Sequence, residues 1–160
     1  MIVELYVFPQ NNNERAVTRQ MLQNMEVDAV EEVDGQEKKS KTKLDTDEKI
    51  GQVFPDGKWH KVVFKDRITG GDREKADAMQ WKRDPITGNV VHVPYRYGKS
   101  WVLALLKSWD FTDPEDGEPL PTTEQGYDAL CEDACAILET SVLENKDAIY
   151  PNLKTPLTIK

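Results

Sequence analysis

The most apolar stretch of the chain reads Ser100-Trp-Val-Leu-Ala-Leu-Leu-Lys-Ser-Trp109. Trp101, Leu105 and Trp109 recur every four residues, which places them on one face of a helix, and the residues between them widen that face. A helix that is apolar nearly all round belongs in a core. The sequence therefore predicts a central helix over 100–109.

The N-terminal residues predict a strand followed by a helix. Val3, Leu5 and Val7 alternate with other side chains until Pro9, which is the pattern of a short strand. An asparagine at position 11, 12 or 13 can then cap a helix. We expect this helix over 13–25, where valine, methionine and leucine recur on one face.

Two more helices complete the expected helical core. Thr122 and Gln125 have the spacing of a capping box and predict a helix over 122–143, with Tyr127 and Leu130 at the start of its apolar face. A shorter helix is expected over 72–83. It follows a turn made by two glycines, with an aspartate as its cap.

Turn residues divide the rest of the chain into short extended pieces. A hairpin is expected from residues 50–65 around Pro55-Asp-Gly57, and a second extended piece is expected after the turn at 84–89. The predicted fold class is thus α+β, a small helical core with short β-hairpins and extended N- and C-terminal arms. The expected segments are a strand and helix at 1–25, a charged linker or mobile loop at 26–49, an α+β core domain at 50–150 and a C-terminal arm at 151–160.

Composition and charge restrict the function. The chain has 29 acidic and 21 basic residues and a net charge of -8, which opposes binding to a phosphate backbone. We expect no direct contact with nucleic acid. The longest apolar run, 101–106, is too short to span a membrane, and the N-terminus has no basic segment followed by an apolar one. We therefore expect no contact with a membrane and no secretion.

No group of residues predicts catalysis or a cofactor. Cys131 and Cys135 lie on a predicted helix, where we interpret them as reduced thiols rather than a disulfide or a zinc site. His60 and His92 have no nucleophile or second ligand at a useful spacing. The glycines before residue 72 lack the spacing of a phosphate loop. We expect a non-enzymatic protein without metal or cofactor.

The acidic, proline-rich loop at 110–121 is predicted to be a rigid turn. Aligned as a calcium loop on Gly117, it places Thr112, Pro114 and Thr123 where oxygen ligands are required. The prolines instead restrict the backbone, and Gly117 is expected at a positive φ.

Three stretches in order give the chain a resemblance. They read Phe64-Lys-Asp-Arg-Ile-Thr-Gly-Gly-Asp-Arg-Glu-Lys-Ala76, Lys99-Ser-Trp-Val-Leu-Ala-Leu-Leu-Lys-Ser-Trp-Asp-Phe111 and Asp116-Gly-Glu-Pro-Leu-Pro-Thr-Thr-Glu124, and a helix follows. This order resembles the tail assembly chaperones of long-tailed bacteriophages, over about residues 64–143. The N-terminal strand, the lysine-rich stretch and the proline-bearing tail depart from the compact helical pattern of that family.

The resemblance implies a protein that coats the phage tape-measure protein and holds it soluble in the host cytoplasm until tail-tube subunits polymerise around it. The tape-measure protein and the tail-tube protein are then the expected partners. An alternative is a structural component of the particle, such as a head, connector or tail protein in the virion that binds neighbouring subunits through its arms. Self-association and an acidic inhibitor of a DNA-binding enzyme are further interpretations.

Five residues are the candidate contacts for such a partner. The helix at 100–109 holds more apolar residues than one buried stripe needs, so we expect it to pack on the helix at 122–143 and leave apolar surface for a partner helix. The candidates are Trp101, Leu105, Trp109, Tyr127 and Leu130.

Overall fold

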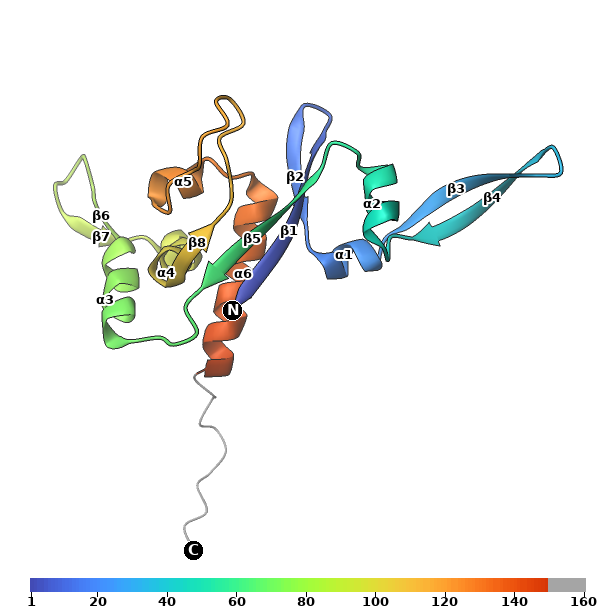
Figure 1. Cartoon of the computed structure of the whole chain (residues 1–160). Helices are drawn as coiled ribbons and strands as arrows, with labels where there is room; N and C mark the ends of the chain where they lie inside the picture. The colour runs from blue at the N-terminus through green and yellow to red at the C-terminus, as the bar shows by residue number, and fades with distance from the viewer. Residues whose placement is uncertain (150–160) are drawn as a thin grey trace, which may run out of the picture. The chain divides into compact units, whose positions relative to one another are not determined.

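A computed structural model describes residues 1–149, which divide into two compact units (Figure 1). The first unit comprises Met1–Val3, Lys61–Leu130 and the chain from Cys135, and the second comprises Glu4–His60 and Cys131–Ala134. Helices and antiparallel strands mix in the chain, which confirms the α+β class. The expected arm at 151–160 lies outside the described residues. No helix among the described residues is both long and apolar enough to cross a membrane.

The first unit holds most of the helices. Its elements are β5 (Lys58–Phe64), which begins in the second unit, α3 (Gly70–Met79), β6 (Trp81–Arg83), β7 (Val90–His92), the 3-10 helix η1 (Pro94–Arg96), α4 (Tyr97–Leu105), β8 (Leu106–Trp109), α5 (Glu124–Asp128) and α6 (Glu132–Ile149), whose first turn belongs to the second unit. Strands β6 and β7 pair as a short hairpin. The extended piece expected after the turn at 84–89 is confirmed as β7.

Helix α4 is the centre of the first unit's core. Every residue from Ser100 to Leu105 is buried, in agreement with a stretch that is apolar nearly all round. The helix ends earlier than predicted, and residues 106–109 form β8 instead. There Trp109 pairs with Val62 of β5 in an antiparallel register. Pairing with β5 supplies backbone hydrogen bonds that a sequence pattern does not show.

Helix α3 begins with a capping box. The Thr69 side chain accepts a hydrogen bond from the Asp72 backbone N–H at 3.2 Å, and the Asp72 carboxylate accepts one from the Thr69 backbone N–H at 2.9 Å. The expected turn before this helix is confirmed, but the cap is Thr69, and Asp72 is the third helical residue. Lys65 Nζ donates to the same carboxylate at 2.7 Å, so the buried Asp72 is fully paired.

Replacing Asp72 with Asn should lower the free energy of unfolding by about 1 kcal/mol at pH 7. Hydrogen bonds from Lys65 and then Thr69 lower the pKa of Asp72 below its ordinary value of 3.8. A lowered folded-state pKa stabilises the fold above the unfolded-state pKa, and this contribution is lost as the pH falls through the folded value. Urea unfolding should therefore show a difference at pH 7 that disappears by about pH 2. Asp77→Asn, in the same helix, should change stability by less than about 0.5 kcal/mol at either pH.

The loop between β8 and α5 is a network of tight turns. The Asp113 N–H donates to the Glu118 carbonyl at 2.8 Å, and the Leu120 N–H donates to the Phe111 carbonyl at 2.9 Å. The side chains of Asp113 and Asp116 each accept a backbone N–H two residues further on. Gly117 has φ +72, as predicted from the turn pattern.

Replacing Gly117 with Val should cost about 1–2 kcal/mol of stability, because a branched side chain adopts a positive φ poorly. Nothing lies within 4 Å of the added Cβ, so this cost is backbone strain alone. Chemical denaturation measures it. Glu118→Val places the same side chain in the same turn at a residue without positive φ, and should cost clearly less. Equal losses for the two variants would show that strain at Gly117 is not the cause.

The predicted helix over 122–143 is two helices, α5 and α6. Thr122 and Gln125 do not form the expected capping box, because Thr123 is the N-cap and its side chain makes no capping hydrogen bond. The break comes after α5, where the N–H groups of Ala129 and Leu130 bond to carbonyls only three residues earlier. This tight final turn redirects the chain into α6.

The second unit begins with a hairpin where a helix was predicted. Its elements are β1 (Ile2–Gln10), β2 (Asn13–Val17), α1 (Arg19–Gln23), β3 (Glu26–Val33), β4 (Gln36–Lys43) and α2 (Asp47–Val53). The helix expected over 13–25 is confirmed only as the short α1, capped by the Thr18 side chain. Asn11 and Asn12 have φ of 50 and 66, so they make the two-residue turn that joins β1 to β2 instead of capping a helix.

The charged stretch expected to be a linker or mobile loop forms a hairpin instead. Strands β3 and β4 pair antiparallel from Glu26↔Lys43 to Val33↔Gln36, and Asp34 and Gly35 at positive φ make the turn. The dipeptide Asp34-Gly35 is a strong sequence signal for a two-residue hairpin turn. The prediction of a linker gave more weight to the charged composition of this stretch than to that dipeptide. Figure 1 shows this ribbon extending beyond α1 and α2.

Aromatic residues form the core of the second unit. The rings of Phe8 and Phe54 stack with centroids 4.1 Å apart, and Tyr6 Oη donates to the Phe54 carbonyl at 2.6 Å. Leu22, Leu44 and Ile50 are buried in the same cluster. Residues 47–53, part of which was predicted as a strand, are helix α2, which Thr46 caps. The expected strand after Pro55-Asp-Gly57 is confirmed as β5.

Candidate functional site

The structure buries the main candidates for partner contact. Trp101, Leu105 and Tyr127 are buried in the first unit, and Trp109 and Leu130 are half-buried. Trp109 Nε1 donates to the Leu120 carbonyl at 2.8 Å, which ties its ring to the loop before α5. A partner could reach the buried residues only if the unit opened.

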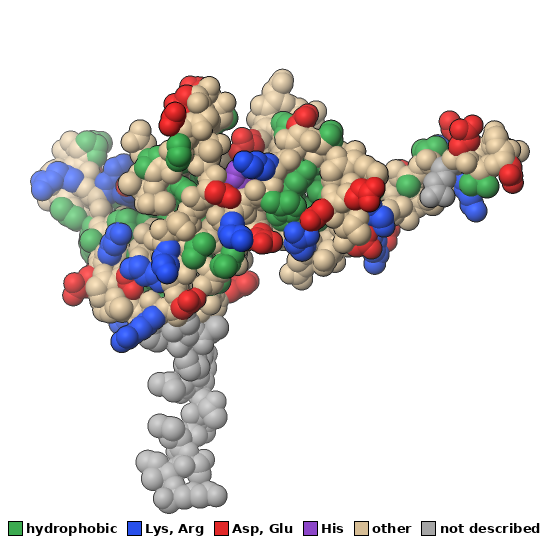
Figure 2. All heavy atoms as spheres, viewed as in Figure 1, with side chains coloured by type: hydrophobic (Ala, Val, Ile, Leu, Met, Phe, Trp, Pro, Cys, Tyr) green, Lys and Arg blue, Asp and Glu red, His purple; other side chains and the backbone are tan. Residues whose placement is uncertain are grey.

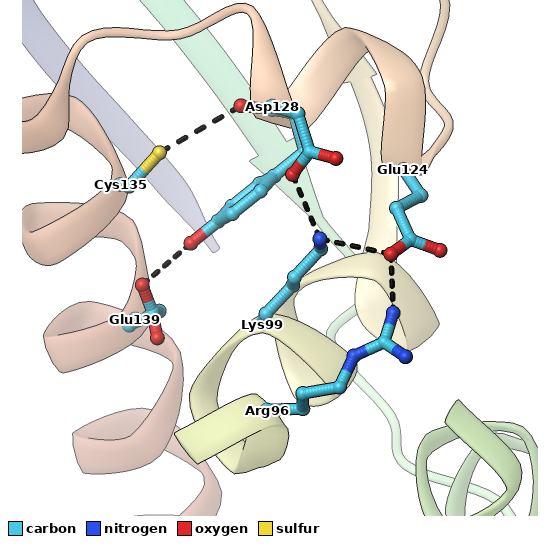
Figure 3. Close-up of polar contacts among 7 residues, drawn as sticks. Arg96, Lys99, Glu124, Asp128, Cys135 and Glu139 are labelled. Atoms are coloured by element: carbon cyan, nitrogen blue, oxygen red, sulfur yellow. Dashed lines mark hydrogen bonds and ion pairs between the residues drawn. The ribbon is translucent and has the colours of Figure 1, made fainter. Parts of the chain in front are cut away.

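A charged network joins α4 to α5 (Figure 3). Lys99 Nζ lies 2.9 Å from Glu124 Oε1 and 2.7 Å from Asp128 Oδ1, and Arg96 also bonds to Glu124. Burial lowers the pKa of Lys99, but its hydrogen bonds to Asp128 and Glu124 outweigh burial and raise it. The hydrogen bond from Lys99 lowers the pKa of Glu124. Lys99 and Glu124 are therefore charged at neutral pH and pair with each other.

The same network continues to α6 through Tyr127. Tyr127 Oη donates to Glu139 Oε2 at 2.5 Å, and Cys135 Sγ lies 3.7 Å from the Tyr127 carbonyl (Figure 3). Burial and then the bond to Glu139 raise the pKa of Tyr127, so its hydroxyl stays protonated. Gly98 of α4 packs against Glu139, and a Cβ at this position would overlap the Glu139 side chain. The network thus holds α4, α5 and α6 together and presents no activated nucleophile.

A second polar cluster fixes the β6–β7 hairpin. Gln80 Nε2 donates to Ser100 Oγ at 3.2 Å, and Gln80 Oε1 lies 3.0 Å from His92 Nε2. The Val93 N–H donates to the Gln80 carbonyl at 2.7 Å. Gln80 and Ser100 are buried, so these bonds join the hairpin to α3 and α4 at the edge of the core.

Sequence reasoning missed an exposed apolar surface on this hairpin. We call it the hairpin surface and define it by five exposed large side chains, which are Trp81, Ile86, Val90, Tyr95 and Tyr97. Val91 is also exposed, but it lies on the opposite face of the hairpin from Trp81 and Val90. Figure 2 shows hydrophobic and basic side chains next to one another in this region. The surface could have been predicted from the sequence, because apolar residues lie in and around a turn, where few are expected.

Neither a metal site nor a similarity to known proteins assigns a function to the described residues. Within residues 1–149, no three His, Cys, Asp or Glu side chains are close enough together to hold a metal ion. Cys131 and Cys135 form no disulfide with each other, and burial raises the pKa of Cys131. Comparison with known proteins gave no match to a family model, a curated protein or a solved structure.

Proposed function

We propose that the protein is a non-enzymatic assembly protein of a long-tailed bacteriophage, which binds the tape-measure protein in the host cytoplasm and keeps it soluble during tail assembly. The observation that carries this proposal is the order of the three stretches within residues 64–143. Apart from Cys131–Ala134, all of these residues belong to the first unit. The resemblance therefore corresponds closely to one compact unit.

The physical properties of the chain support a role in binding proteins. A long helical partner with apolar stripes needs apolar contacts for shielding and charge for solubility. The chain offers the hairpin surface for the first and a net charge of -8 for the second. In the first unit's charged network, Lys99 is paired with both Glu124 and Asp128, which favours a structural role over a catalytic one.

Co-expression with the tape-measure protein of the same genome tests the proposal. The expected result is a soluble tape-measure protein that co-purifies with this chain. An unrelated acidic protein of similar size serves as the control and should leave the tape-measure protein in the insoluble fraction. Equal precipitation of the tape-measure protein with and without this chain would refute the chaperone role.

The β3–β4 hairpin favours a second candidate, a structural component of the virion. It is a separate two-stranded sheet, so each strand has one edge without a strand partner among the described residues. Isolated two-stranded ribbons are marginally stable, and a strand added by a neighbouring subunit would extend them. Under this candidate the protein would be present in purified particles at a fixed copy number.

A further inference from the structure

Apart from Ile2, the exposed large apolar side chains of the first unit lie within residues 81–97 in the part of the chain that the structure describes. Ile86, in the turn between β6 and β7, is 92% exposed, and Tyr95 is 80% exposed. Trp81, Val90, Val91 and Tyr97 are also exposed. Single exposed apolar residues are ordinary, but the five residues of the hairpin surface include a tryptophan and two tyrosines, which is the composition of an interface.

The backbone beneath this surface is fixed. Trp81 pairs with His92 and Arg83 pairs with Val90, and the ring of Trp81 meets that of His92 edge-on at 5.2 Å. The bonds of Gln80 to His92 and to Val93 hold the hairpin to the core. The apolar side chains therefore project from an ordered backbone. Binding of a partner would cost little conformational entropy, because the hairpin is already ordered.

A hollow of about 400 Å³ shares Tyr97 with this surface. It is lined by Arg73, Asp77, Gln80, Tyr97, Trp101 and Lys146. Lys146 Nζ lies 5.0 Å from the centroid of the Trp101 ring and 3.2 Å from Tyr97 Oη. The hollow therefore offers aromatic walls and an ammonium group to an incoming side chain.

The local charge is opposite in sign to that of the whole chain. The β6–β7 hairpin carries Lys82 and Arg83 against Asp84, and Lys146 lines the hollow. The hairpin thus has an excess of positive charge on a chain with a net charge of -8. Such a patch attracts a negatively charged segment and repels a basic one.

We propose that the hairpin surface and this hollow form a docking site for a protein segment that carries apolar side chains flanked by aspartate or glutamate. Tryptophan, tyrosine and arginine are the residues that most often dominate binding energy at interfaces. The aliphatic residues Ile86 and Val90 fit an apolar peptide better than stacked bases, and the acidic chain disfavours nucleic acid. In so far as the segment belongs to the tape-measure protein, the inference rests on the proposed function.

Fluorescence anisotropy with two sets of labelled peptides tests the site. One set covers the tape-measure protein of the same genome in overlapping 20-residue peptides, and the other holds a designed peptide of alternating Glu and Leu with one Trp and its Lys-for-Glu counterpart. We expect acidic apolar peptides to bind the full chain. The variant Ile86→Ala with Tyr95→Ala should weaken binding about tenfold. Lys82→Glu with Arg83→Glu should weaken it further at low salt.

The controls separate a lost contact from a lost fold. Val30→Ala with Val33→Ala removes two exposed valines from β3 and should leave affinity unchanged. Because Ile86 and Tyr95 are almost fully exposed, their variant should keep the melting temperature of the parent protein.

Three outcomes would overturn the inference. They are unchanged affinity in the Ile86 and Tyr95 variant, binding of the Lys-for-Glu peptide as tight as that of the acidic one, and a preference for an oligo-dT strand over every peptide. Failure of all peptides to bind counts against it equally. If the designed acidic peptide binds in an Ile86- and Tyr95-dependent way but no tape-measure peptide does, the site stands and the proposed partner is wrong. If the whole tape-measure protein binds parent and variant equally, the function stands and the site is wrong.

Discussion

Replacing Gly126 with Ala should lower the free energy of unfolding by about 3 kcal/mol. A Cβ on Gly126 would overlap the carbonyl oxygen of Pro121 and come within 3.1 Å of the Trp109 ring. The obstacle is a backbone atom of a proline in a loop of tight turns, so it cannot move aside as a flexible side chain would. The Trp109 bond to the Leu120 carbonyl restricts the same loop.

Urea unfolding followed by circular dichroism measures this loss. Gly70→Ala is the matched control in the same unit, because nothing lies within 4 Å of its added Cβ. That control should leave stability unchanged or raise it by up to about 1 kcal/mol. A Gly126→Ala protein as stable as its parent would contradict the close approach of α5 to the loop before it.

Replacing Leu105 with Ala should lower stability by about 2–5 kcal/mol, the range for a fully buried leucine. Leu105 is 1% exposed in the core around α4. The sequence predicted it as a partner contact, and that role would leave the stability of the free protein nearly intact. Thermal unfolding of the free protein therefore separates the two roles of this residue.

Two further variants serve as controls, because they remove apolar side chains that are less buried than Leu105. Leu130→Ala removes a half-buried leucine and should cost less than Leu105→Ala. Ile86→Ala removes a side chain that is 92% exposed and should cost almost nothing. A Leu105→Ala protein with parental stability and lost partner binding would show that Leu105 belongs to the interface after all.

The sequence predicted correctly those elements that depend on residues close together in the chain. The apolar run that became α4, the alternating strand β5 and the positive φ of Gly117 each follow from periodicity or turn chemistry. The errors arose where one signal hid another. Asn11 and Asn12 suit both a helix cap and a hairpin turn, and pairing with β1 decided for the turn.

The candidate site was harder to predict, because burial depends on partners that are distant in the sequence. Trp101 and Leu105 were correctly placed together, but their periodicity could not show that the rest of the first unit covers them. In the sequence, Asp128 lies 29 residues after its partner Lys99, and strand β8 and a loop lie between the two helices that carry them. In a chain with 31% charged residues, no pattern singles out those partners.

Quantitative mass spectrometry of an infected culture tests the central claim most directly, namely that this is an assembly protein and not a part of the particle. Peptides of the chain should be abundant in the cell lysate before phage release and absent from purified particles, in which tail-tube and tape-measure peptides serve as internal standards. Recovery of the chain from purified particles at a fixed copy number relative to those standards would contradict the chaperone role and favour the structural one.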